Sequence, residues 1–528
     1  MAENSDAVVV PIRALSGRLD NDDPNYVFGG PDIYLTLALA YDSLAAPGWR
    51  DTGDGAGEPD YHAMQPRLAL DWREEPDGNW IVRLRPDVLS QAGNAFGAED
   101  IAFAIDKAYA HRTLSSWRWR EVVGVEGVDV VDRHTIRYRL RAPYPTFPNW
   151  LQSVTPNVVD SHTARAHATP GDPWGIDWLN DNVAGYGPYA LIDKSEDSMR
   201  FRQRPDYWGA PTGARDIELC RVPDRASAFA TLEEARAAVV IAIDPDETLK
   251  LLRREDVRLL RTWAGHVSVE IDFTRAPFDD KRVRQALAFA TPYERILSEG
   301  LIGLARPWRS PVKRVSQWYR DEGFPYRHDV ARARTLLAEA GHAGGLRSDF
   351  HVPRRPDCQR MAEILAVAWR EAGVELDIKD IADSSPGWMP PLHLRTECAH
   401  NLSEPIYDIA HDYAAMDPLV PPPGGPPNVG TWRPRWVKNE AAIRAYCEML
   451  LEKDPARKRQ RFDELQAWLV DFSSSIFLAE VQHVTAVNRH VPDALIAPQS
   501  RFFQAIQYQN CLSIYLPERH KDTACGCA

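Results

Sequence analysis

The sequence predicts an α/β protein that is divided into two or three lobes. A chain of 528 residues is too long for a single hydrophobic core, which favours several lobes. Segments with strand character alternate with amphipathic helical segments, a pattern typical of layered α/β folds. No repeat of fixed period runs through the sequence. The hydrophobic content of 44% and the charged content of 26% are ordinary for a globular protein.

The elements can be placed in order along the chain. Residues 7–44 begin with a β-rich run and continue with a helical stretch through residues 35–40. Residues 45–181 are rich in strands and turns. Two apolar strand segments are expected further on, at residues 257–260 and 267–271.

Several helices are predicted from their caps and apolar stripes. Asp280 can accept hydrogen bonds from the first-turn N–H groups of a helix. One apolar face then follows at helical spacing: Val283, Ala286, Leu287 and Ala290. Near the C-terminus, Asp454 is a suitable N-cap and Pro455 suits the first helical position. Its apolar face comprises Phe462, Leu465, Trp468 and Leu469. Gly341 and Gly373 stand where two other helices should end.

Composition and missing motifs exclude several functions. The formal net charge of −13 argues against nucleic acid or an anionic membrane as a partner. No run of 18 apolar residues occurs, so we expect no membrane-spanning segment. Walker A, GxGxxG, HExxH and GxSxG motifs are absent from the sequence. We therefore expect no cofactor and no metal, and the role of Cys525 and Cys527 in the tail stays open.

The segment from Pro277 to Ala290 resembles the start of the second lobe in one family of binding proteins. That family is the family-5 (peptide/nickel type, cluster C) extracellular solute-binding proteins of ABC importers. Two of its most recognisable motifs resemble Gly185-Tyr186-Gly187-Pro188-Tyr189 and Arg204-Pro205-Asp206-Tyr207-Trp208-Gly209. Five more motifs match in the family's order, at 77–85, 98–105, 134–144, 336–341 and 454–457. A set of motifs that keeps its order is far more specific than any single match.

The resemblance implies a fold and a division into domains. It predicts a two-lobed, periplasmic-binding-protein-like (type II) α/β fold with a small extra domain inserted in the first lobe. Strands near residues 258–275 should cross between the lobes. The first lobe should comprise residues 1–44, 182–262 and, with the C-terminal tail, 484–528. The extra small domain should comprise residues 45–181, and the second lobe residues 263–483.

The resemblance also places the ligand in a cleft between the lobes and suggests the residues that line it. They are expected in the loop after the first strand, before the Gly-Pro-Tyr turn, near the crossing strands and in a late second-lobe segment. Many of them are carboxylates or aromatic rings, which favours a cationic or amine-bearing ligand. The candidate ligand-binding residues are Asp22, Asp23, Tyr26, Tyr186, Trp263, His266, Glu270, His411, Asp412, Tyr413 and Trp432.

The segment around Asp412 departs from the family's pattern. Peptide binders of the family often carry a Trp there and, slightly later, an Asp that pairs with the free α-ammonium of the peptide. Here His411-Asp412-Tyr413 stands near the Trp position, and Ala414 or Ala415 occupies the expected Asp position. Asp412 can substitute for that Asp, or it can simply cap a turn.

Two functions are compatible with this reading. The first is capture of a peptide or amine-bearing small molecule between two lobes for ABC-type import, by a monomer that presents its ligand to a membrane permease. The alternative is a cytoplasmic derivative of the fold that acts as an enzyme or carrier on a small metabolite in a biosynthetic pathway. In that case the acid–base candidates are Asp412, His411, Glu270 and His266.

The N-terminus and the cysteines bear on where the protein acts. Residues 1–6 carry no basic region, and no apolar signal core precedes Val8. If Met1 is the native start, the chain is expected in the cytoplasm; otherwise the resemblance predicts a periplasmic or cell-surface protein. The seven cysteines are scattered and odd in number, which is more common in a reducing compartment.

Overall fold

The computed structural model describes residues 7–12, 31–111, 119–120, 123–141, 143–144, 147–152, 158–234, 237–273, 275–312, 314, 318–380, 391–398, 448–449, 452, 454–498, 500–503 and 506. Within these residues the strands form three sheets. Each sheet has its own hydrophobic core.

The first sheet belongs to the first lobe. Its strand order is β1 (Ala7–Ile12), β10 (Asp216–Arg221), β9 (Ser198–Gln203) and β8 (Tyr189–Lys194). β1 pairs with β10 in parallel, and the other pairs are antiparallel. Apolar residues from α1 (Pro31–Ala40), α4 (Ser161–Ala166) and α5 (Ile176–Leu179) pack against this sheet and complete its core.

A small antiparallel sheet forms a separate domain within the first lobe. Its order is β4 (Ala69–Glu74), β5 (Trp80–Leu84), β7 (Thr135–Leu140) and β6 (Val125–Asp132). Helix α2 (Ala98–His111) and the short helix η2 (Phe147–Gln152) supply the rest of its core. These strands lie in the chain between β1 and β8, so the domain interrupts the first lobe.

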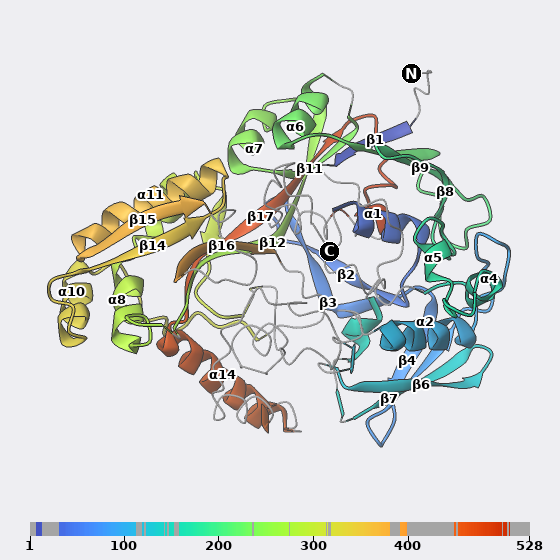
Figure 1. Ribbon diagram of the computed structural model, residues 1–528, viewed down its shortest axis with the longest axis horizontal. Coiled ribbons are helices and arrows are strands. Elements are labelled where there is room, and N and C mark those ends of the chain that lie inside the picture. Colours follow the sequence, from blue (N-terminus) through green and yellow to red (C-terminus); the bar gives the residue numbers. More distant parts are fainter. Residues whose placement is uncertain are drawn as a thin grey trace.

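The largest sheet connects the lobes. Its main path runs β11 (Val239–Ile243), β17 (Ser475–Asn488), β12 (Val257–Ile271), β16 (Leu392–Cys398), β14 (Leu346–Val352) and β15 (Val374–Asp380). The short strand β13 (Ala305–Pro307) pairs with β17. The hairpin of β2 (Ala45–Asp51) and β3 (Gly57–Pro66) reaches this sheet where Gly57 pairs with Thr262. Figure 1 shows the first sheet at upper right with β8 and β9, the small sheet at lower right with β4, β6 and β7, and the largest sheet running from β11 through the middle of the view to β14 and β15 at left.

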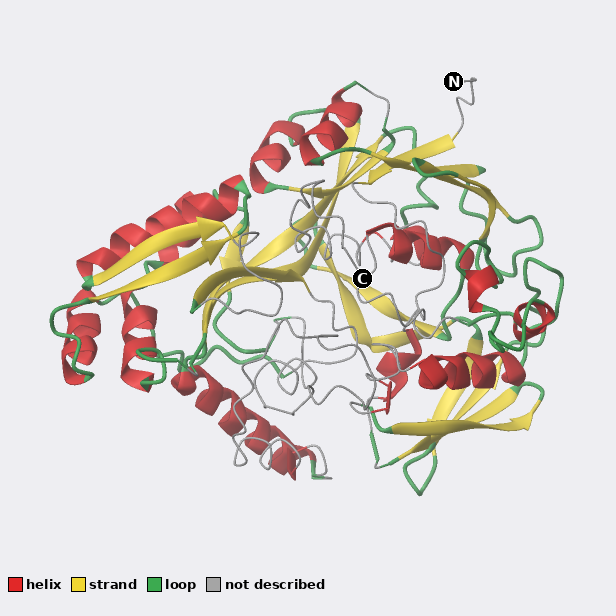
Figure 2. Ribbon diagram, in the orientation of Figure 1, coloured by secondary structure: helices red, strands yellow, loops and turns green. Residues whose placement is uncertain are grey.

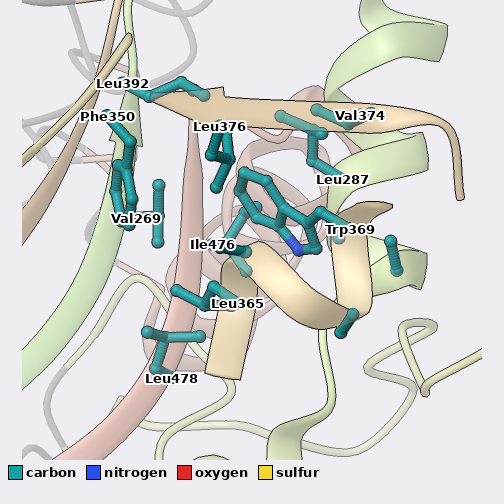
Figure 3. Close-up of a cluster of buried hydrophobic side chains, with 14 of the residues drawn as sticks. Val269, Leu287, Phe350, Leu365, Trp369, Val374, Leu376, Leu392, Ile476 and Leu478 are labelled. Carbon is teal, nitrogen blue, oxygen red and sulfur yellow. The ribbon is translucent and has the colours of Figure 1, made fainter. Parts of the chain in front are cut away.

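Helices gather around the β14 and β15 end of the large sheet, as Figure 2 shows, and define the second lobe. They are α8 (Lys281–Ala290), α9 (Tyr293–Arg295), the π-helix η3 (Ile296–Gly300), α10 (Val330–Glu339) and α11 (Pro356–Glu371), whereas α14 (Pro455–Phe472) extends away from these strands and meets α8 at its C-terminal end (Figure 1). The core between them and the sheet is centred on the fully buried Trp369, which Figure 3 shows among Leu287, Leu365 and Val374.

Two further helices flank the first-lobe end of the same sheet. They are α6 (Arg225–Glu233) and α7 (Pro245–Leu251), and they pack with β11 and with the first-lobe ends of β12 and β17. Asp244 caps α7 in a reciprocal arrangement with Glu247, which fixes where this helix begins.

The local signals in the sequence are confirmed by the structure. The Asp280 side chain accepts a hydrogen bond from the backbone N–H of Arg282, and the predicted apolar face of α8 is buried. Asp454 caps α14 with Pro455 at its start. Gly341 and Gly373 follow the last turns of α10 and α11 with φ of 89° and 95°, a conformation that favours glycine.

The prediction of two separate strand segments at 257–260 and 267–271 is wrong. One strand, β12, covers Val257–Ile271 without interruption. The intervening residues stay in the strand because β17 pairs with them throughout, with two shifts of register. The domain boundaries given above remain predictions.

Candidate functional site

The strands β12 and β17 join the two lobes. They pair antiparallel from Val257 with Asn488 to Glu270 with Ser475. Val257 lies in the hydrophobic cluster of the first-lobe end, whereas Val269 and Ile271 lie in the second-lobe core. Each strand therefore passes from one lobe into the other, and any relative movement of the lobes must bend this pair.

The pairing of β12 with β17 shifts register between Trp263 and Gly265. A Cβ atom at Gly265 would lie 2.6 Å from His483 Nε2 and 2.7 Å from Val481 Cγ2. Only glycine allows β17 to approach so closely at this point. The shift lies between the part of β12 that packs in the first lobe and the part that packs in the second.

Four side chains meet beside this shift, and we call them the hinge cluster: Glu58, Trp263, Arg306 and Glu480. Arg306 Nε donates a hydrogen bond to Glu480 Oε2 at 2.6 Å. The Arg306 guanidinium carbon lies 4.2 Å from the centre of the Trp263 ring, a favourable cation–π distance. Arg306 Nη2 lies 3.7 Å from Glu58 Oε2. The cluster thus draws one residue from each of β3, β12, β13 and β17.

Both carboxylates of the cluster are buried. Glu480 is only 4% exposed and Glu58 only 5% exposed. Burial raises the pKa of the Glu480 carboxyl, and the Arg306 and Arg314 guanidinium groups oppose this effect. A buried carboxylate is costly without a cation beside it, so Arg306 is needed where it stands.

Neighbouring residues hold the cluster in place. Trp263 Nε1 donates to Asp54 Oδ2 at 2.9 Å, from the turn between β2 and β3. Arg50 on β2 donates from Nε to Glu58 Oε1 at 2.7 Å. The β2–β3 hairpin therefore presents Glu58 to the joint between the lobes and is itself anchored there.

The predicted ligand-binding residues that the structure describes fall into two places. Trp263 belongs to the hinge cluster. His266 pairs in register with Glu480, and its ring packs at a tilt against Trp308, with ring centres 4.3 Å apart. Glu270 lies further along the same strand and accepts hydrogen bonds from the hydroxyls of Ser268 and Ser475, both at 2.8 Å.

Tyr186 lies apart from these residues. It is 0% exposed in the core of the small domain, where its ring packs edge-to-face against Phe96. Burial raises the pKa of its hydroxyl far above the ordinary range, and the carboxylate of Asp100 adds to this. In this conformation the side chain is closed to a solute.

The remaining predicted site residues lie outside the described residues. They are Asp22, Asp23, Tyr26, His411, Asp412, Tyr413 and Trp432. Their roles stay predictions.

Sequence reasoning missed Glu58, Arg306 and Glu480. One signal could have revealed Glu480, because it interrupts the apolar run from Ile476 to Val481 on a buried strand. An ionisable residue in such a run needs a partner. Glu58 and Arg306 carry no comparable local signal.

Two features are absent from the described parts of the chain. No group of three or more His, Cys, Asp or Glu side chains within them could hold a metal ion. No helix described here has the length and apolar character needed to cross a bilayer.

Solved structures with the same architecture define the fold class. A substrate-binding protein of an ABC transporter, CtaP from Listeria monocytogenes, aligns with a TM-score of 0.77 at 16% identity, over 96% of this chain and 98% of that one. DppA from Helicobacter pylori in complex with the peptide STSA aligns with a TM-score of 0.71 at 17% identity, over 91% and 94%. The protein therefore has the two-lobed, type II periplasmic-binding-protein fold.

Sequence comparison identifies the family. A sequence model of the bacterial extracellular solute-binding proteins, family 5 (middle region), matches residues 63–422. The chain belongs to this family, as its motifs predict. It is 25% identical over 336 residues to heme-binding protein A of Haemophilus influenzae, covering 59% of this chain and 61% of that protein. It is also 25% identical over 339 residues to the dipeptide-binding protein of Escherichia coli, covering 59% and 62%. The matches thus span about three fifths of these curated relatives.

Proposed function

We propose that this protein captures a peptide or amine-bearing small molecule between its two lobes for ABC-type import. The observation that carries the proposal is the joint itself: separate cores are connected by the long pair β12 and β17, with a shift of register between them. A protein built in this way can close around a ligand by bending at the joint.

The names of similar proteins support the class of ligand. One relative is named as a dipeptide-binding protein, and another as a heme-binding protein. A structure from Pseudoalteromonas holds the dipeptide Met-Leu, and one from Campylobacter jejuni, NikZ, holds Ni(L-His). These relatives are binding proteins, which favours capture over the enzyme alternative.

Ligand binding should shift the equilibrium between an open and a closed state. A ligand that touches both lobes only in the closed state shifts the protein toward that state. Moving the population from mostly open to mostly closed requires roughly 5 kcal/mol of differential affinity.

The proposal includes where the protein acts and with which partner. It works outside the cytoplasm as a monomer, and it passes its ligand to an ABC permease.

Within the cleft, Asp412 is our choice for the cationic group of the ligand, and Tyr413 for contact with its apolar part. Breaking a buried charge pair from one side costs roughly 3–5 kcal/mol. Asp412→Ala should therefore weaken binding at least a hundredfold and leave the melting temperature of the free protein nearly unchanged. Tyr413→Ala should weaken binding less. Loss of turnover with intact binding would instead favour the enzyme alternative.

The experiment that tests the proposal is a thermal-shift screen with defined probes. The probes are the dipeptide Met-Leu, the tetrapeptide Ser-Thr-Ser-Ala, Ni(L-His) and a panel of cationic metabolites. A ligand that binds only the folded protein raises its stability by RT ln(1 + [L]/Kd). A probe that binds should also reduce the radius of gyration in small-angle scattering. Saturable binding without any change of radius would contradict capture by closure.

A further inference from the structure

The hinge cluster lies across the shift of register in β12. On one side of the shift, β12 pairs with β3 where Thr262 meets Gly57, and Glu58 is the next residue of that hairpin strand. On the other side, β13 pairs with β17 through Arg306 opposite Glu480. β17 at this point runs beside the second-lobe half of β12. Arg306 therefore reaches from the second-lobe side of the joint to Glu58 and Trp263 on the first-lobe side.

The hairpin that carries Glu58 is attached to the first lobe. Leu44 and Ala45, at its base, lie in the core of the small domain. Trp49 packs edge-to-face on Phe503 with ring centres 4.9 Å apart. Phe503 follows Phe502, which lies in the first-lobe core. Since the hairpin is held by the first lobe at its base and through Trp49, Glu58 must move with that lobe.

The contact between Arg306 and Glu58 is incomplete in this conformation. Arg306 Nη2 is buried, and among the residues that the structure describes no acceptor forms a hydrogen bond with it. The Glu58 oxygen at 3.7 Å is beyond the usual N–H···O range of about 2.7–3.2 Å. A buried donor without an acceptor is unfavourable. An approach of the two sides by less than about 1 Å would turn this contact into a direct, charge-assisted hydrogen bond.

We propose that Arg306 and Glu58 form a latch between the lobes that tightens when the protein closes on its solute. The inference rests on the proposed function and adds to it two positioning residues that set affinity without touching the ligand. Glu480 keeps the Arg306 guanidinium oriented in both states through the 2.6 Å hydrogen bond. Trp263 provides the surface over which the guanidinium lies. Closure then gains the pair with Glu58.

Glu58→Gln is the variant of choice for the test. It preserves the size of the side chain and leaves the Arg306–Glu480 pair intact. It also weakens the pair between Glu58 and Arg50, but the Arg50 side chain is 51% exposed, so this loss should matter little. Arg306→Lys is the second variant, because an ammonium group keeps the charge beside Glu480 but lacks the fork that reaches both carboxylates. Asp71→Asn is the matched control, since its pair with Arg83 is an exposed Arg–carboxylate pair within the small domain.

The first measurement is the affinity for whichever thermal-shift probe binds the wild type, with Met-Leu as the first choice. Each latch variant should bind roughly tenfold more weakly, as expected for a typical coupling between sites. The double variant Glu58→Gln/Arg306→Lys should be little weaker than either single one. The melting temperature of the free protein should change little, and Asp71→Asn should bind normally. A purely structural pair would instead lower the melting temperature and leave affinity unaltered, which overturns the proposal.

The second measurement does not depend on a ligand being found. A ketone-bearing amino acid is introduced at the exposed positions Ile192 and Val367, one in each lobe, and carries spin labels that leave the native thiols untouched. Glu58→Gln should shift the distribution of distances between the lobes toward longer values. Coincident distributions of wild type and Glu58→Gln, with and without the probes, overturn the latch. Failure of every probe to bind wild type, beside distributions that differ, would overturn only the proposed function.

Discussion

Arg284 offers a sharp test of how the second lobe is held together. Its guanidinium is almost fully buried. Nε and Nη2 donate to the carbonyl oxygen of Phe472 at 3.0 and 2.8 Å, and Nη1 donates to that of Phe278 at 2.8 Å. Phe472 is the last residue of α14, so Arg284 satisfies a carbonyl that the helix itself leaves open. The perturbation we consider is Arg284→Met, which removes the guanidinium and leaves an unbranched apolar side chain.

The expected loss of stability depends on the groups that Arg284→Met leaves without a partner. Burial lowers the pKa of Arg284 to about 10, so the site disfavours a cation. Removing the charge should therefore stabilise the folded state in part. Against this, the carbonyls of Phe472 and Phe278 lose their donors. Each such loss costs about 1–3 kcal/mol. We expect a net destabilisation of about 3 kcal/mol, which corresponds to a fall of roughly 6–12 °C in the melting temperature of a unit of this size.

The assay is thermal unfolding followed by circular dichroism on wild type, Arg284→Met and the control Arg295→Met. Arg295 pairs with Glu299 one turn away on the surface of the same lobe, so its loss should cost no more than about 0.5 kcal/mol. If Arg284→Met melts within a degree or two of Arg295→Met, the capping role of Arg284 is refuted.

Three further predictions concern Gly265, the Glu480 carboxyl and the cysteines. Gly265→Ala should destabilise the protein by about 1–3 kcal/mol because the new methyl overlaps side chains of β17, whereas Gly171→Ala, with open space around it, should not; chemical denaturation checks both. Because burial raises the pKa of Glu480 above its ordinary value of 4.5, the folded state binds the extra proton, so the stability of wild type relative to Glu480→Gln should fall as pH rises above 4.5. The seven cysteines are scattered and odd in number, so mass spectrometry of unreduced protein should find at most one disulfide; three disulfides would contradict this prediction.

Elements whose boundaries are written in local sequence could be predicted. The caps at Asp280 and Asp454 and the glycines at 341 and 373 act within one or two turns of the chain, so short-range reasoning is sufficient for them. The extent of β12 was harder to predict from the sequence. Gly265 in the middle of β12 resembles a break, and only the partner strand β17 explains why the strand continues through it.

The candidate site also combines residues that could be predicted from the sequence with residues that could not. Trp263 and His266 could be proposed because the family resemblance places crossing strands near them, and the structure places both on β12 at the joint. Their partners could not, because Glu58, Arg306 and Glu480 come from three distant segments that are joined only by strand pairing. No spacing in the sequence encodes that encounter.

The hinge cluster also changes how the charge of the joint should be understood. From the sequence, carboxylates and rings near the crossing strands favour a cationic ligand. In the structure, the two buried carboxylates beside the shift of register already have cations: Arg306 lies between them, Arg50 pairs with Glu58, and Arg314 lies 3.6 Å from Glu480. The ring of Trp263 already lies against Arg306. This part of the joint is thus internally neutralised, and its charges are available for coupling the lobes rather than for attracting a solute. If the ligand is cationic, its counter-charge must come from elsewhere in the cleft, which makes Asp412 the residue on which that prediction depends.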